Sequence, residues 1–300
     1  MIHSKTLDGY SIEIPLSFHG YNVIQYLDSG TTSVIYLIED QETRQKYSAK
    51  VMSKKDNESK NTMTSIMNEI KILQTIDHPN IIKVKEVLNV DNKNEEYIII
   101  VMDYCSKGDL LSYANNSGFK NEVEKKKIIC GFLEAIKYLH KKEISHGDIK
   151  LENILLDDKL LPKLCDFGFC RTSSIAGEDS KNGTLFYAAP ELLVKGQFNP
   201  LKTDIWAIGI ALYSISELQF PFKEINQYYI VQQILNGNLT INSAINKKLR
   251  TLVERCTSFN PLNRPTVDDI LNDDYFLDIE DGHKQKENNK SNRTVEKLLK

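Results

Sequence analysis

The sequence has no long uncharged apolar run, so we expect no segment that crosses a membrane. A membrane-spanning helix needs about 20 mainly apolar residues, and no stretch of this chain comes near that length. The first ten residues, MIHSKTLDGY, also lack the apolar core of a secretory signal peptide. Neither sign of charge is in excess, because 38 basic and 41 acidic residues give a net charge of −3. This balance argues against a nucleic-acid or membrane surface as partner.

Cysteine is scarce and shows no pairing pattern. The five cysteines are odd in number, are scattered along the chain and include no C-x-x-C pair. They indicate reduced thiols, and we expect an intracellular protein of the cytoplasm or nucleus. With 300 residues and no internal repeat, the chain is long enough for one large domain or two lobes.

What the sequence does have is a stretch, Ile144 to Glu191, that carries two short polar clusters. The first runs from His146 to Asn153, and the second is Asp166-Phe167-Gly168. Between them, two apolar stretches flank the turn-like Asp157-Asp158. This pattern predicts a short hairpin with a polar group at each end.

The residue types in these clusters suit phosphoryl transfer. Asn153 and Asp166 offer hard oxygen ligands, which suit Mg²⁺ with phosphates and water completing its shell. Asp148 precedes Asn153 by five residues and can face a substrate hydroxyl, while Lys150 can neutralise a phosphoryl group in transfer. Positioning and charge neutralisation supply most of the catalysis in such reactions.

The stretch resembles the catalytic and activation segments of the eukaryotic protein kinases. HGDIKLEN resembles H-R-D-L-K-x-x-N, and it is followed by DFG and by AAPE at the A-P-E position. Later matches are Asp204-Ile205-Trp206, whose aspartate anchors the catalytic loop in the family, and Asn263-Arg264-Pro265, whose arginine pairs with Glu191. The order and spacing of these motifs make the resemblance specific, and it covers residues 21–276.

Near its start, the resembling region has a hairpin with a small-residue tip. Two apolar runs, residues 23–27 and 34–38, flank residues 28–33. We match Gly30 and Val34 to the pattern G-x-G-x-x-G-x-V, whose outer glycines are replaced by Asp28 and Ser33. The resemblance implies that Leu27, Gly30 and Val34 contact ATP and that backbone N–H groups of the tip approach its phosphates.

A lysine and a glutamate further along resemble the pair that positions the nucleotide. Residues 47–51, YSAKV, resemble the V-A-I-K strand, which makes Lys50 the phosphate-binding lysine and Ala49 a nucleotide contact. Glu69 lies within a helical pattern of apolar residues that we expect to begin at Thr64 or Ser65. The resemblance implies an ion pair between Lys50 and Glu69.

The apolar strand at residues 97–102 leads into a segment that resembles the link between the two kinase lobes. Met102 falls at the gatekeeper position, and backbone groups of Asp103 and Cys105 would pair with adenine. Leu155 is a further implied nucleotide contact. Asp109 would meet the ribose or a basic substrate side chain, although a helix-capping role explains it equally well.

The resemblance implies an α+β fold with two lobes and ATP in the cleft between them. Residues 1–20 form an extension without an assigned role. The catalytic domain spans 21–276, with a mainly antiparallel small lobe at 21–103 and a mainly helical large lobe at 104–276. The charged tail, 277–300, is predicted to be disordered.

The implied activity is transfer of the ATP γ-phosphoryl group to protein Ser or Thr, with Mg²⁺ bound by Asn153 and Asp166. Lys150 is the residue typical of serine/threonine kinases at its position. Thr184 is expected to hydrogen-bond to Asp148 and Lys150. Glu152 and Asp109 match positions that bind a basic residue upstream of the target, and Leu185 with Ala188 suggests an apolar pocket after it.

Two departures from the family pattern leave alternatives open. Gly147 replaces the arginine that pairs with activation-loop phosphate in many kinases, so the catalytic loop is of the non-RD type. The altered glycine loop is the one feature that favours a pseudokinase acting as an interaction module, whereas the complete set of catalytic residues argues against it. A kinase-like enzyme acting on small molecules is disfavoured by AAPE, which closes a peptide-binding activation segment.

Overall fold

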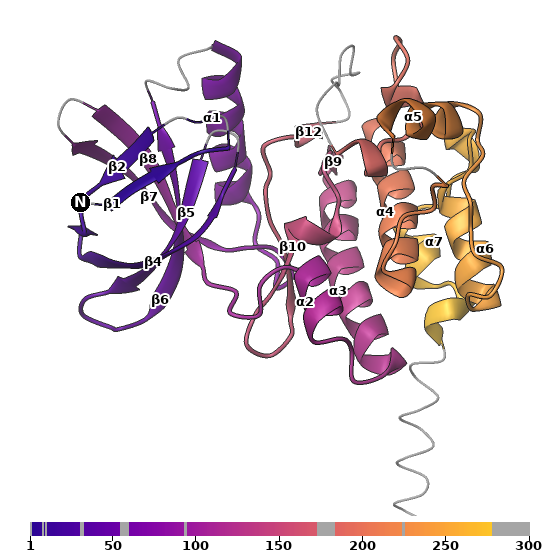
Figure 1. The fold of residues 1–300 in the computed structure, drawn as a ribbon, viewed down its shortest axis with the longest axis horizontal. Coiled ribbons are helices and arrows are strands. Elements are labelled where there is room, and N and C mark those ends of the chain that lie inside the picture. The colour runs from indigo at the N-terminus through magenta and orange to yellow at the C-terminus, as the bar shows by residue number, and fades with distance from the viewer. Residues whose placement is uncertain are drawn as a thin grey trace, which may run out of the picture. The chain divides into compact units, whose positions relative to one another are not determined.

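The computed structural model describes residues 2–7, 9, 11–30, 33–54, 60–92, 95–172, 184–223 and 226–277. The chain divides into two compact units, and each is described by itself (Figure 1). The first unit comprises residues 1–108 and 155–170, and the second comprises 109–154 and 171–300. Residues 155–170, which the sequence analysis placed in the large lobe, therefore pack with the first unit.

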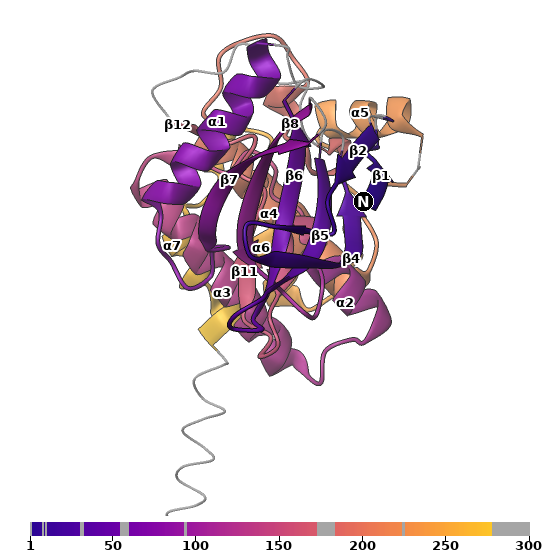
Figure 2. The ribbon, with the colours of Figure 1, turned by 90° about the vertical axis from the view of Figure 1, so that its left-hand side faces the viewer.

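The first unit is built on a six-stranded sheet in the order β3-β4-β5-β6-β8-β7. Neighbouring strands in this sheet run antiparallel. The bounds are β3 Ser17–Phe18, β4 Tyr21–Ser29, β5 Ser33–Asp40, β6 Lys46–Ser53, β7 Val84–Asn92 and β8 Glu95–Asp103. Figure 2 views this sheet face-on, with β7 on the left and β4 on the right. The predicted hairpin at residues 23–38 is confirmed as β4 and β5.

The alternation of side chains along each strand gives the sheet two apolar faces. On β8, Ile98 and Ile100 face helix α1 (Lys60–Thr75) and pack against Ile66 and Ile70. The predicted start of this helix at Thr64 or Ser65 is wrong, because the helix begins at Lys60. Once a helix is nucleated by its packed face, each added residue contributes one hydrogen bond, so it extends beyond the apolar pattern.

The opposite face of the sheet is covered by a hairpin from the N-terminal extension. Strands β1 (Ile2–Lys5) and β2 (Ser11–Ile14) form a separate two-stranded antiparallel sheet. Ile12 and Ile14 of this hairpin are buried in one cluster with Tyr36 and Ile99 of the large sheet. The hairpin and α1 thus lie on opposite sides of the sheet (Figure 1). Ile12 and Ile14 are therefore part of the core of the first unit.

The second unit is mainly helical. Its α-helices are α2 Leu110–Asn116, α3 Glu122–Lys141, α4 Pro200–Glu217, α5 Gln227–Leu235, α6 Lys247–Cys256 and α7 Val267–Leu271. Its shorter elements are β9 Ile144–Ser145, η1 Leu151–Asn153, β12 Arg171–Thr172, η2 Leu185–Tyr187, η3 Pro190–Leu192 and η4 Pro261–Asn263. Helix α4 is the centre of this unit, since 14 of its 18 residues are buried. A helix that is apolar on all sides belongs in a core.

The predicted hairpin after Asn153 is present as β10 (Ile154–Leu156) paired with β11 (Pro162–Leu164), and the chain passes from the second unit to the first within β10. A sheet in one unit and helices in the other confirm the α+β class. No helix among the described residues is long and apolar enough to cross a membrane. The five cysteines all lie in described segments, and none of them forms a disulfide. The tail from residue 278 lies outside the described residues.

Candidate active site

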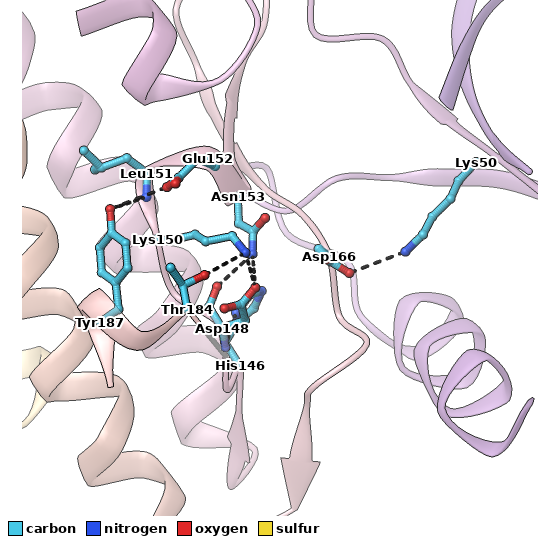
Figure 3. Close-up of polar contacts among 10 residues, drawn as sticks. All are labelled: Lys50, His146, Asp148, Lys150, Leu151, Glu152, Asn153, Asp166, Thr184 and Tyr187. Carbon is cyan, nitrogen blue, oxygen red and sulfur yellow. Dashed lines mark hydrogen bonds and ion pairs between the residues drawn. The ribbon is translucent and has the colours of Figure 1, made fainter. Parts of the chain in front are cut away.

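The first unit contains a buried lysine held by two carboxylates. Lys50 Nζ lies 2.7 Å from Glu69 Oε1. It also lies 3.4 Å from Asp166 Oδ1 (Figure 3). Burial alone would lower the pKa of Lys50, but the attraction of Glu69 and Asp166 outweighs it and raises the pKa. The ammonium group is therefore charged at neutral pH, and its position between β6 and α1 is fixed, as the predicted ion pair requires.

Asp166 is placed by an unusual backbone conformation. Its φ of 63° lies in the left-handed region, which aspartate tolerates better than most residues. The next residue, Phe167, is fully buried and anchors this turn. The Asp166 side chain remains 38% exposed. A carboxylate that is fixed at its base and open at its tip is suited to a hard cation such as Mg²⁺.

The second unit contains a compact polar loop around Asp148. Lys150 Nζ lies 2.6 Å from Asp148 Oδ2, and Asn153 Nδ2 donates to the same oxygen at 2.9 Å and to the Asp148 backbone carbonyl at 2.8 Å (Figure 3). Because the Asn153 amide nitrogen is engaged with Asp148, its amide oxygen is the atom suited to a metal ion. Lys150 Nζ also donates to Thr184 Oγ1 at 3.3 Å. Of the two hydrogen bonds predicted for Thr184, the one to Lys150 is thus confirmed.

One buried aspartate of helix α4 accepts hydrogen bonds from the backbone of this loop. Asp204 accepts hydrogen bonds from the backbone N–H groups of His146, at 2.8 Å, and Gly147, at 2.9 Å. Its Oδ2 also lies 2.9 Å from His140 Nε2. Charged acceptors make the stronger hydrogen bonds, so Asp204 fixes the backbone immediately before Asp148. This anchoring role was implied by the sequence resemblance and is confirmed.

Two of the predicted nucleotide contacts are wrong. Lys50 pairs with Ile35 across β5 and β6, whereas Tyr36 pairs with Ala49 and Val34 with Val51. Because successive side chains alternate between faces, Val34 and Ala49 lie on the face opposite Lys50. Both are fully buried beneath the N-terminal hairpin.

Ile35 and Ser48, each one position from a predicted residue, lie on the face of Lys50 instead. The spacing of the two family motifs does identify Ile35 and Ser48. When Asp28, Gly30 and Ser33 are aligned with the three glycines of G-x-G-x-x-G-x-V, the final valine falls on Ile35. In YSAK, likewise, the second position of V-A-I-K falls on Ser48.

Gly30, directly after β4, makes two backbone hydrogen bonds. The Gly30 N–H donates to the Ser33 carbonyl at 2.8 Å, so it is engaged within the loop. The Gly30 carbonyl accepts from the Leu7 N–H of the N-terminal hairpin, also at 2.8 Å. Thr31 and Thr32 lie outside the described residues. Leu27 is half-buried at a bulge in β4.

The segment that follows β8 contains the predicted adenine contacts. Met102 pairs with Ser48 and therefore lies on the face of Lys50. The Asp103 N–H donates to the Lys83 carbonyl at 3.0 Å, and Cys105 is buried, with its pKa raised to about 12 by burial and by Asp103. Leu155 is half-buried in β10. Asp109 Oδ1 accepts from the Ser112 N–H at 2.8 Å, so Asp109 caps α2, as the structural alternative proposed.

Comparison with known proteins settles the family. The family model described as "Protein kinase domain" matches residues 21–276. The chain belongs to the protein kinase family.

Several curated relatives align over most of the kinase. Serine/threonine-protein kinase SAPK2 of Oryza sativa subsp. indica is 28% identical over 86% of this chain and 76% of its own length. Serine/threonine-protein kinase SIK1 of Rattus norvegicus is 30% identical over 87% of this chain but 33% of its own length. CBL-interacting serine/threonine-protein kinase 14 of Arabidopsis thaliana is 30% identical over 86% of this chain and 58% of its own length.

A second predicted ion pair of the kinase is also present, away from the reacting groups. Arg264 donates from both terminal nitrogens to Glu191, at 2.6 and 2.8 Å, and is almost completely buried against the ring of Trp206. A bidentate arginine–carboxylate pair is geometrically specific. It ties the end of the activation segment to the helical core.

A cavity of about 610 Å³ opens beside the Asp148 loop within the second unit. Asp148, Thr184, Leu185, Ala188 and Tyr228 are among the residues that line it. Tyr187 also lines it and directs its hydroxyl toward the Leu151 N–H, at 3.4 Å, and Glu152, at 3.5 Å (Figure 3). Tyr187 was not among the site residues expected from the sequence, although its position three residues before Pro190 in the activation segment was a signal.

Proposed function

We propose that this protein kinase transfers the γ-phosphoryl group of ATP to serine and threonine side chains of proteins. The observation that carries the proposal is the geometry of the Asp148 loop, in which Lys150 and Asn153 converge on one carboxylate oxygen. The Lys50–Glu69 pair supports it, because a chain without catalysis has no need to retain a buried charged pair. The printed names of the relatives support serine and threonine as acceptors.

Each polar group has a role in the proposed reaction. Asp148 orients the substrate hydroxyl and accepts its proton, while Lys150 neutralises charge on the transferred group. Asn153 and Asp166 hold Mg²⁺, which together with ATP supplies the activated phosphoryl group when bound. Thr184 keeps Lys150 in place through its hydroxyl.

The face of the sheet that carries Lys50 is proposed to receive the nucleotide. Lys50 binds its α- and β-phosphates in a position set by Glu69. Ile35, Ser48 and Met102 lie on the same face and would contact the adenosine. Leu27 and Leu155 are further apolar contacts, and Asp103 and Cys105 offer backbone groups to the adenine edge.

The experiment that tests this function uses purified chain, radiolabelled ATP, Mg²⁺ and a peptide library. Wild type should label peptides on serine or threonine, and Asp148→Asn and Asp166→Asn should each lower the rate by about 10² to 10⁴ with the fold intact. Equal rates for wild type and both variants would show that the site is assigned wrongly. An inactive wild type that still binds ATP would identify a pseudokinase.

We further propose that substrates carry a basic residue upstream of the target and an apolar residue after it. Glu152 supports the first preference, and the Leu185–Ala188 wall of the cavity supports the second. Asp109 is a weaker candidate because it caps α2. On a peptide array, Glu152→Gln should lose the upstream preference and Asp109→Asn should keep it. A wild-type profile without upstream arginine or lysine would contradict the idea.

We also propose an intracellular site of action, in the cytoplasm or nucleus, because none of the five cysteines in the described segments forms a disulfide.

A further inference from the structure

The N-terminal hairpin is rigidly attached to the sheet that carries Lys50. Ile12 and Ile14 are 1% and 0% exposed, and burying such a side chain stabilises by about 1.5–3 kcal/mol. The Glu13 N–H donates to the Tyr97 hydroxyl at 3.2 Å, and β2 lies against β6. A two-stranded hairpin is marginally stable alone. Its order therefore comes from this packing, and its far end is held in a defined place.

The turn of this hairpin meets the tip of the β4–β5 loop. The Gly9 N–H donates to the Thr6 carbonyl at 3.0 Å, which makes Leu7 the second residue of a β-turn. The Thr6 side chain is buried, whereas Leu7 is 71% exposed. The backbone N–H of Leu7 nevertheless has a partner, because it donates to the Gly30 carbonyl at 2.8 Å.

We propose that the N-terminal hairpin positions the β4–β5 loop through the bond between Leu7 and Gly30, and thereby raises the affinity of the kinase for ATP. The role of the nucleotide in this inference rests on the proposed function. Gly30 is the position most in need of restraint, since glycine has the greatest backbone freedom. A loop that is ordered before the ligand arrives loses less conformational entropy on binding. Leu7 is thus a positioning residue that acts through Gly30.

One substitution removes the contact and leaves the rest of the hairpin in place. Leu7→Pro deletes the N–H donor, and proline is favoured at the second position of common β-turns. Leu7→Ala is the matched control, because it deletes the same exposed side chain but keeps the N–H. Hydrogen exchange is measured at the amides of Ser29, Gly30 and Ser33 without nucleotide, and KM for ATP and kcat are measured with a peptide substrate.

Leu7→Pro should accelerate exchange of these three amides and raise KM for ATP by about two- to twelvefold, the range that one net hydrogen bond represents. The value of kcat at saturating ATP should stay unchanged, and Leu7→Ala should behave as wild type. A purely structural role would instead lower the midpoint of unfolding and the active fraction without changing KM. Equal exchange and equal KM in the two variants would overturn the proposal.

The exchange comparison needs no activity, so it separates this inference from the proposed function. If wild type binds no ATP, the proposed function fails, while faster exchange in Leu7→Pro still establishes the link between hairpin and loop. Should Leu7→Pro fail to fold, Tyr97→Phe removes the hydroxyl that receives the Glu13 N–H and keeps the buried ring. Faster exchange at both Glu13 and Gly30 in Tyr97→Phe would then support the proposal, and faster exchange at Glu13 alone would refute it.

Discussion

For a single residue in β5 or β6, the face of the sheet decides between a role in the core and a role beside Lys50. Val34 and Ile35 are neighbours in the chain, yet Val34 packs under the N-terminal hairpin. Ile35 pairs with Lys50 across β5 and β6 and lies on the same face of the sheet. The same division separates Ala49 from Ser48. Val34 and Ala49 are fully buried and contribute to stability, whereas Ile35 is half-buried beside Lys50 and can contact a ligand there.

This division predicts opposite effects for two alanine substitutions. Val34→Ala should lower the free energy of unfolding by about 1–3 kcal/mol, because it leaves a cavity in the core, and should leave KM for ATP unchanged. Ile35→Ala should raise KM for ATP with a smaller loss of stability. Urea unfolding and steady-state kinetics measure both quantities. The assignment of faces is wrong if Val34→Ala changes KM more than Ile35→Ala does.

The Lys50–Glu69 pair gives a second prediction at the residue scale. The Lys50 and Glu69 side chains are 15% and 6% exposed, so Glu69→Gln leaves a buried ammonium group with Asp166 as its remaining carboxylate partner among the described residues. The free energy of unfolding should fall by about 3 kcal/mol. Because the folded pKa of Lys50 is raised, the stabilisation by the pair is present below the pKa of the unfolded lysine and is lost only as pH rises through the folded pKa. The difference between variant and wild type should therefore be constant from about pH 6 to pH 9.

The surface pair Lys54–Glu96 is the matched control for this substitution. Its two atoms lie 2.8 Å apart, but the side chains are 32% and 60% exposed. Glu96→Gln should change stability by less than about 1 kcal/mol, since water screens exposed pairs. Equal losses for the two glutamates would mean that burial of the Lys50 pair has no energetic effect.

Among the secondary-structure elements, the close approach of α4 to α6 depends on one glycine. A Cβ at Gly209 would lie 2.7 Å from Cys256 Cβ and 2.8 Å from Thr257 Cγ2. Gly209→Ala should therefore destabilise by about 1–3 kcal/mol through overpacking, although alanine is the better helix former.

Ser214→Ala on the same helix is the control, because its buried hydroxyl has no hydrogen-bond partner among the described residues and its loss should be nearly neutral. Chemical unfolding followed by circular dichroism measures both variants. A Gly209→Ala variant as stable as wild type would show that α6 can move away freely.

The elements that could be predicted from the sequence are those with a long periodic pattern or a fixed motif. The strands β4, β5 and β8, the helical pattern around Glu69 and the polar loop around Asp148 belong to this class. The hairpin β1–β2 could not be predicted, because its strands have four residues each and their burial depends on a partner sheet distant in sequence. The errors at Val34 and Ala49 have a different origin. A shift of one residue moves a side chain to the other face, and the motif had lost the glycines that fix its alignment.

At the scale of the whole molecule, the activation segment is held at both ends by contacts that involve no phosphate. At its start, β12 pairs with β9 through Arg171 opposite Ser145, and Ser145 Oγ donates to the Arg171 carbonyl at 3.3 Å. At its end, Glu191 is fixed by Arg264. Gly147 adopts a φ of 81° and gives its N–H to Asp204, and it offers no side-chain charge.

This arrangement predicts that activity does not depend strongly on a phosphate in the activation segment. The possible acceptors are Thr172, at the edge of β12, and Ser173, Ser174 and Ser180, which lie outside the described residues. Phosphatase treatment, or replacement of all four by alanine, should lower kcat/KM by less than about tenfold. Thr184→Ala should lower it more, because Thr184 contacts Lys150.

A hundredfold loss of kcat/KM in both experiments, about 2.7 kcal/mol of transition-state stabilisation, would contradict this prediction and show that another basic residue has replaced the missing arginine. Arg171 is the residue to examine first, since it lies at the start of the segment with its guanidinium 5.9 Å from the ring of Phe198. Gly147→Arg tests the same prediction by restoring the arginine of the family pattern. A non-glycine residue at a φ of 81° is strained by about 1–2 kcal/mol, so this variant should lose stability and should not gain dependence on phosphate.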